Sequence, residues 1–177
     1  AGFTWRWWTA ALHSRGMWHS LANSVIIGLA ATVIALALGA MAALAVQRYE
    51  FFGRQVINLL VVLPITLPGI VTGIALNATF TSALGLTLGL ATVVVGHATF
   101  CIVIVFNNIQ ARLRRMGTTL EDASADLGAS PWQTFRFVTF PMLRGALVAG
   151  AILAFALSFD EIVVTTPYYV PSTPVQD

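Results

Sequence analysis

The sequence predicts an all-α protein, a polytopic transmembrane helical bundle. Hydrophobic residues make up 58% of its 177 residues and charged residues only 9%, and the mean hydropathy is +0.84. Soluble domains carry about 25% charged residues. The chain also contains four long apolar segments, each near the ~20 residues that a helix needs to cross a bilayer. We therefore expect one transmembrane domain over residues 1–177, with the lipid bilayer as its solvent.

We expect the four spans at about 24–46, 56–80, 88–109 and 143–165. Pro64 and Pro68 lie inside the second span and should bend it. A bent helix would suit the lining of a translocation path, although an ordinary kink is equally consistent with the two prolines.

Small residues recur at four-residue spacing in the first and fourth spans, as in Ala35/Gly39/Ala43 and Ala146/Gly150/Ala154. Such stripes let helices approach closely in lipid. His97 and Cys101 share a face of the third span, but a metal site needs three or four ligands. We therefore expect His97 to bond to a neighbouring helix.

The arginines predict the orientation of the spans. The sequence has no lysine, and seven of its nine arginines fall in the first and third connections: Arg48, Arg54, Arg112, Arg114, Arg115, Arg136 and Arg144. The positive-inside rule makes these connections cytoplasmic. Residues 1–23 and the turn near 81–86 then face outward. The net charge of +2 is too small to indicate nucleic acid as a partner.

The longest polar break, residues 118–141, carries the signals of a helix, a turn and a second helix. Thr118 with Glu121 fits a capping box, which places a helix start there. Gly128 can take the left-handed conformation that ends a helix. One face of this first helix would hold Leu120, Ala123 and Leu127.

The second helix of this loop should begin at Ser130. Ser130 is a good N-cap, Pro131 suits the first helical position, and Gln133 completes a capping box. A loop with such defined local structure is either a docking surface or an ordinary interfacial loop, and spacing alone does not decide between them.

The same loop resembles the EAA loop of ABC importer permeases, whose pattern is E-A-A-x3-G-x9-I-x-L-P. Asp122-Ala123-Ser124 occupies the E-A-A positions, Gly128 follows after three residues, and Val138-Thr139-Phe140-Pro141 follows after nine more. The flanking stretches LEDASADLGASPWQTF and LSFDEIVVT resemble permeases of the PotC type, which serve spermidine/putrescine importers. The likeness covers about Phe3 to Thr165.

The resemblance implies a type I ABC importer permease of the bacterial inner membrane, which carries polyamines. It implies as partners two ABC ATPase subunits, a second permease resembling PotB, and an extracytoplasmic substrate-binding protein. The residues that couple transport to the ATPases would be Glu121, Asp122, Ala123, Ser124, Leu127, Gly128 and Pro141.

The sequence also indicates that this chain does not hydrolyse ATP alone. A P-loop requires a lysine to hold the phosphates, and the chain has none. We therefore expect no catalytic site and no cofactor here, with ATP and Mg bound by the partner ATPases. Other solutes (ferric ion, an opine, sulfate or a phosphonate) remain open, as do an ion-coupled secondary transporter and a non-transporting scaffold.

Two adjacent acids, Asp160 and Glu161, lie near the end of the fourth span. Acids in such positions are costly and often functional. A helix would place Asp160 about 24 Å from Arg144, toward the outer face. We expect the substrate path to include these acids with Pro64 and Pro68, although capping or interfacial roles would also explain an acidic pair.

The chain is expected to be incomplete. It begins at Ala1 without a methionine, and the resemblance implies further spans before and after the four described. The tail 166–177 differs from the residues that come after DEIVVT in the family.

Overall fold

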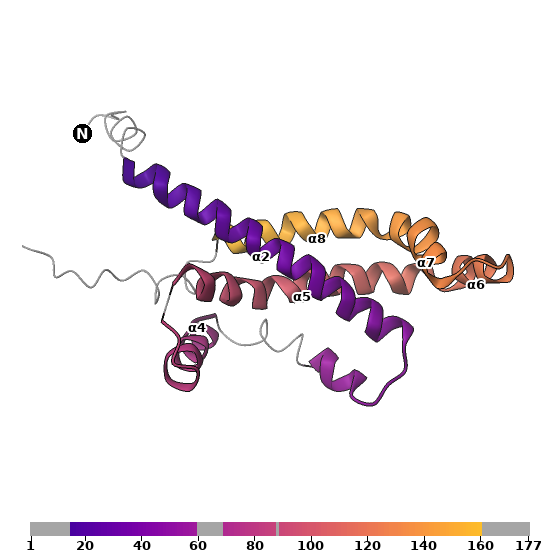
Figure 1. The fold of residues 1–177 in the computed structure, drawn as a ribbon, viewed down its shortest axis with the longest axis horizontal. Coiled ribbons are helices and arrows are strands. Elements are labelled where there is room, and N and C mark those ends of the chain that lie inside the picture. Colours follow the sequence, from indigo (N-terminus) through magenta and orange to yellow (C-terminus); the bar gives the residue numbers. More distant parts are fainter. Residues whose placement is uncertain (1–14, 60–68, 88, 161–177) are drawn as a thin grey trace, which may run out of the picture.

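Three long helices form a bundle in the computed structural model, which describes residues 15–59, 69–87 and 89–160. They are α2 (Arg15–Arg48), α5 (Leu90–Met116) and α8 (Phe140–Asp160). Figure 1 shows α2 crossing over α5, with α8 alongside. The described residues contain no strand, which confirms the all-α prediction.

The small-residue stripe of α2 packs directly on α5. Ala35 and Ala43 are fully buried, and a Cβ at Gly39 would lie 3.0 Å from the carbonyl oxygen of Ile102. Val105 stands 3.1 Å from the same position. The helices therefore approach so closely that a side chain at Gly39 would require α5 to shift, which fits the close packing that the four-residue spacing predicts.

The stripe of α8 also packs on α5, but less tightly. Ala154 is fully buried, and a Cβ at Gly150 would lie 3.6 Å from the Val105 backbone. The buried core around these contacts includes Phe106, Ile109 and Leu113 of α5. The helix α5 is thus the central element, with α2 and α8 packed against it.

The remaining surface of the bundle is strongly apolar. Val33 on α2 and Ile152 on α8 are 65% and 64% exposed, and many other large hydrophobic side chains are also exposed. In water such a surface would be unstable, whereas in a bilayer it faces lipid tails. Among the described residues, three helices are long and apolar enough to span a membrane: Trp18–Arg48, Leu90–Met116 and Pro131–Asp160.

The helix bounds differ from the expected spans at several ends. The first helix begins before residue 24, and α5 continues past residue 109 to Met116. The extension of α5 ends in Arg114 and Arg115, which suit a helix C-terminus because its dipole is negative there. Hydropathy locates only the apolar part of a helix. The expected spans are therefore shorter than α2 and α5 at the ends where these helices continue into polar residues.

The second expected span is described only at its ends. Residues 54–59 are helical, α4 spans Gly69–Ala78, and the π-helix η1 spans Thr79–Ala83. Pro64 and Pro68 lie outside the described residues, so the predicted bend stays a prediction.

The orientation can be tested by labelling from outside the cell. Thr119 in α6 and Ser82 in η1 are both exposed. Figure 1 shows α6 and α4, the helix directly before η1, toward opposite ends of the bundle. In a Cys101→Ala background, we expect an impermeant thiol reagent to label Ser82→Cys in intact cells and Thr119→Cys only after lysis. Labelling of position 119 but not 82 in intact cells would reverse the topology.

Candidate functional site

The loop at residues 118–141, called the coupling loop below after the role that the resemblance implies for it, leaves α5 through a glycine. Gly117 has φ 63°, a conformation that L side chains rarely adopt. The helix α6 (Thr119–Asp126) then begins with Thr118 as N-cap, as predicted. The chain direction therefore changes sharply at one residue.

The predicted capping box at this N-terminus is wrong. The Thr118 side chain makes no capping hydrogen bond, and its carbonyl oxygen instead accepts from the Asp122 N–H at 2.9 Å. The Glu121 carboxylate does not reach back to Thr118 because it is held by two other side chains.

Those two partners come from other helices. Arg48 at the end of α2 forms a salt bridge to Glu121 Oε1 at 2.5 Å, and the Thr139 hydroxyl donates to the same oxygen at 2.7 Å. The Arg48 guanidinium also lies 3.4 and 3.5 Å from the Gly117 carbonyl oxygen. Both charged side chains are mostly shielded, at 17% and 18% exposed. Glu121 thus connects α2, α6 and the segment that leads into α8.

Ser124 provides a second internal connection. Its hydroxyl lies 2.6 Å from that of Thr134 in α7 (Pro131–Thr134). Glu121 and Ser124 are one helical turn apart, so both face the rest of the coupling loop. The resemblance assigns them to ATPase coupling, and the structure places their side chains inside the loop.

Gly128 ends α6 as predicted. It has φ 83°, its N–H donates to the Ala125 carbonyl, and the Ala129 N–H donates to the Ser124 carbonyl. This pair of bonds is a Schellman motif, which satisfies the last carbonyls of the helix. A side chain at Gly128 would meet no atom within 4 Å, so its requirement for glycine is conformational rather than steric.

The second helix of the coupling loop begins as predicted but does not end within the loop. Ser130 accepts from the Gln133 N–H, and the Gln133 side chain accepts from the Ser130 N–H at 2.7 Å. The helix continues from α7 through the π-helix η2 (Phe135–Thr139) into α8. The prediction of a separate short helix is therefore corrected to one continuous helix over Pro131–Asp160.

The π-helical turn explains how Pro141 fits inside this helix. Proline lacks an N–H and its ring clashes with the carbonyl four residues earlier. Directly before it, the Phe140 N–H bonds to the Phe135 carbonyl five residues back. The wider turn makes room for the ring, as π-bulges do at helix irregularities.

The opposite side of α6 is exposed. Asp122, Ala123 and Asp126 are exposed, Leu120 is 53% exposed, and Leu127 is 89% exposed. Figure 1 shows α6 projecting beyond the ends of the long helices. The coupling loop therefore has a bonded inner side and a free outer side that carries leucines and acids.

An open groove of about 440 Å³ lies between the coupling loop and the end of α2. Leu44 and Tyr49 line one wall, and Ala125, Pro131 and Phe135 line the other. The Arg48–Glu121 pair also lines it, so the groove and this junction share one site.

The predicted substrate-path residues are only partly described. Asp160 is exposed at the end of α8. Glu161, Pro64 and Pro68 lie outside the described residues. Figure 1 places that end of α8 away from the coupling loop, as expected for opposite sides of a membrane.

Near Asp160, polar contacts connect α5 to α8. His97 Nδ1 lies 2.8 Å from Ser158 Oγ, and the Cys101 thiol donates to the Ala154 carbonyl at 3.2 Å. The predicted partnership of His97 with a neighbouring helix is confirmed. Among the described residues, no group of three potential metal ligands occurs.

Comparison with known proteins gives the family. Residues 18–167 match the family described as binding-protein-dependent transport system inner membrane component. This chain belongs to that family. The match covers nearly all of the three bundle helices and the whole coupling loop, so the resemblance in the loop extends to the fold.

The individual relatives of the chain include permease proteins of transport systems. The chain is 33% identical to the putrescine transport system permease protein PotI of Escherichia coli K12, over 94% of this chain and 61% of the relative. It is 31% identical to the spermidine/putrescine transport system permease protein PotC of Haemophilus influenzae, over 93% and 64%. It is also 31% identical to a putative 2-aminoethylphosphonate transport system permease protein, PhnV, of Salmonella paratyphi A, over 97% and 64%.

These relatives are longer than the chain, which spans less than two thirds of their length. The family is one of inner membrane components, so the chain is a helical protein of that membrane.

Sequence reasoning did not identify Arg48, Thr134 or Thr139 as site residues. The arginine pattern marks Arg48 only as a topology signal, and no local pattern links it to Glu121, 73 residues away. The sequence did contain one signal for this contact. Arg48 ends a span and so lies near the membrane surface, where an acid of a cytoplasmic loop such as Glu121 can reach it.

The Glu121–Arg48 contact predicts non-additive effects of mutation. Glu121→Gln and Arg48→Gln should each lower the melting temperature of the purified complex. Each change should cost about 1 kcal/mol, or roughly 2–4 °C. Because both changes remove one interaction, the double variant should melt near the single variants.

The matched control replaces Asp122, the exposed neighbour, by Asn. Asp122→Asn should change the melting temperature little. When it is combined with Arg48→Gln, the two changes in melting temperature should simply add. Additive losses for Glu121→Gln and Arg48→Gln would show that the pair does not stabilise the folded protein.

Proposed function

We propose that this chain is a transmembrane permease subunit of an ATP-driven ABC importer, and that the coupling loop connects it to an ATPase. The observation that carries the proposal is the coupling loop itself. It combines the spacing of an EAA loop with a projecting outer side, and it lies in a chain of the binding-protein-dependent transport family.

In this proposal the outer side of α6 contacts an ATPase subunit through Asp122, Ala123 and Leu127. The inner side transmits the motion. Glu121 connects α6 to α2 and to η2, while the continuous helix from α7 connects the loop to α8. When two ATPase subunits close on ATP, α6 moves with the cytoplasmic ends of the spans and switches the access of the path.

The same proposal includes the other partners. A second permease subunit resembling PotB would complete the path, and an extracytoplasmic binding protein would deliver the solute. ATP and Mg would be bound by the ATPases, with no nucleotide site in this chain.

Polyamines are the proposed substrate, supported by the resemblance of the chain to PotI and PotC permeases. The relative named for 2-aminoethylphosphonate transport supports a second candidate of the same importer class. An ion-coupled secondary transporter would need no ATPase. Purification of the complex separates these classes, because an importer subunit brings an ATPase with it.

Gly128 provides a test of coupling. Gly128→Val forces a β-branched residue into positive φ, which should distort the end of α6. We expect reconstituted complexes to hydrolyse ATP with solute uptake per ATP reduced about tenfold or more. Radiolabelled uptake and phosphate release in the same vesicles measure the ratio.

The control for this test is Gly128→Asn, because asparagine tolerates the left-handed conformation better than other side chains. It should retain most of the coupling. Unchanged uptake per ATP in Gly128→Val would contradict a coupling role for this turn.

The substrate proposal is tested at the acidic pair. Asp160→Asn with Glu161→Gln retains side-chain size and removes two charges that would attract a polycation. We expect spermidine uptake to fall several-fold, while complex assembly and binding-protein-stimulated ATP hydrolysis largely persist.

Normal uptake with poor assembly would instead assign these acids a structural role. Stimulation of ATP hydrolysis by a phosphonate and its binding protein, with none by polyamines, would favour the second substrate.

A further inference from the structure

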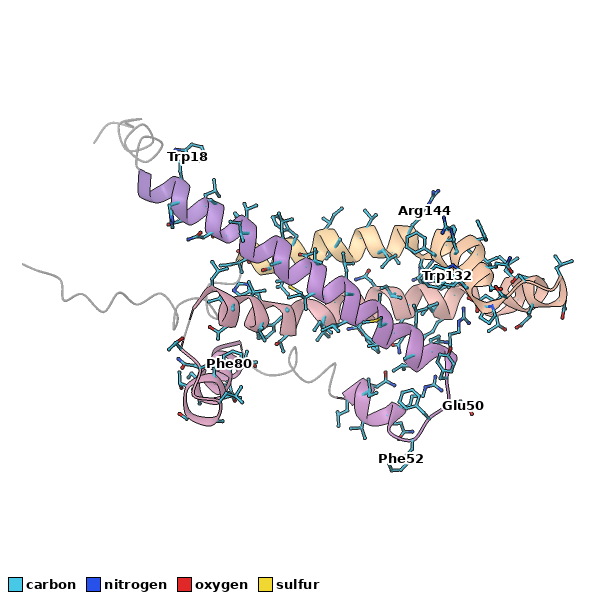
Figure 2. All side chains as sticks on the ribbon, in the orientation of Figure 1. Trp18, Glu50, Phe52, Phe80, Trp132 and Arg144 are labelled. Atoms are coloured by element: carbon cyan, nitrogen blue, oxygen red, sulfur yellow. The ribbon has the colours of Figure 1, made fainter. Side chains whose placement is uncertain are left out.

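A basic pocket lies between α5 and α8 at the arginine-rich end of the bundle, outside the groove of the coupling loop. It is open and has a volume of about 710 Å³. Arg112 and Arg115 line it from α5, and Arg144 lines it from α8. Figure 2 shows Arg144 on α8 near this end.

The three arginines bring positive charge, and no acidic side chain in the described part of the chain forms a salt bridge with them. Among the described residues, a salt bridge joins Arg48 and Glu121, and none involves Arg112, Arg115 or Arg144. Arg112 Nε donates to the Met142 carbonyl at 3.0 Å, which positions its guanidinium at the wall between the two helices. Four further N–H donors of that guanidinium remain for a ligand.

Small residues leave room beside these charges. Ala111, Gly145 and Ala146 line the same pocket. A Cβ added at Gly145 would meet no other side chain or helix within 4 Å, so the pocket is open at this residue. The pocket can therefore accept an anionic group beside the three arginines that line it.

The surroundings favour a lipid over a free anion. Arg144, Val148 and Ile152 follow one another at four-residue spacing and share one face of α8. Val148 and Ile152 are 59% and 64% exposed. An apolar strip thus runs from the basic pocket along the membrane-spanning helix, which matches a charged headgroup followed by an acyl chain.

We propose that this pocket binds the phosphate headgroup of an anionic phospholipid, with an acyl chain along Val148 and Ile152. Guanidinium groups bind phosphate oxygens through charge-assisted hydrogen bonds, and basic pockets at the ends of transmembrane helices suit anionic headgroups. Binding would stabilise the packing of α8 on α5 next to the coupling loop.

The test uses the complete purified complex, stripped of lipid and titrated with phosphatidylglycerol or phosphatidylcholine while its melting temperature is followed. We expect phosphatidylglycerol to raise the melting temperature with the higher affinity. Arg112→Gln and Arg144→Gln should each weaken that affinity roughly fivefold. Gly145→Leu retains all charges and fills the pocket, so it should also abolish the preference for phosphatidylglycerol.

The matched control is Arg114→Gln, which removes an exposed arginine of the same helix turn that does not line the pocket. It should leave the affinity unchanged. An equal loss in Arg114→Gln would mean that general surface charge, not the pocket, attracts the lipid, and would overturn the proposal.

Two further outcomes would also overturn it. Stabilisation of the wild-type complex by inorganic phosphate alone, lost in Arg144→Gln, would assign the pocket to a soluble anion. Loss of complex assembly in Gly145→Leu, with no preference of the wild type for phosphatidylglycerol, would assign it to a contact with another subunit.

Discussion

The arrangement of the coupling loop depends on one carboxylate. Glu121 accepts from Arg48 at the end of α2 and from Thr139 ahead of α8, and it lies itself in the first turn of α6. The end of α2, 73 residues away in the sequence, thus meets α6 and η2 at a single oxygen atom. Because the pair is partly shielded from water, its charges interact more strongly than an exposed pair would. Its larger consequence is geometric, since it fixes the position of a short helix relative to two spans.

That constraint matters because α6 is too short to be stable alone. It has eight residues, and isolated helices shorter than about 12–15 residues are marginal in water. The contacts that retain it are few: the Glu121 pair, the Ser124–Thr134 hydroxyl pair and the Schellman bonds at Gly128. The two side-chain contacts lie on the inner side of α6, so the exposed leucines and acids on its other side are accessible to a partner. Under the proposed function, a helix held by these contacts would transmit the motion of a bound ATPase to the spans without unfolding.

Composition and hydropathy were sufficient to predict the fold class and three of the spans, because the membrane requires long apolar helices and excludes alternatives. Local sequence patterns predicted the helix end at Gly128 and the Ser130–Gln133 capping box, because each of these features depends on residues within four positions of one another. The prediction at Glu121 was wrong because the local capping partner competed with Arg48, a partner far away in the sequence. The π-helical turn before Pro141 was also missed, because the pattern marked the proline but not the continuity of the helix around it.

The central claim is that α6 moves together with the spans, and the distance between two spin labels tests it most directly. Labels at Thr119→Cys and Met41→Cys, in a Cys101→Ala background, report the position of α6 relative to α2 in the complete complex. The account predicts a narrow distribution that is the same without nucleotide and with ATP trapped, and a broad one when Glu121→Gln is added. A shift of several ångströms on ATP binding in the complex with Glu121 intact would contradict rigid coupling.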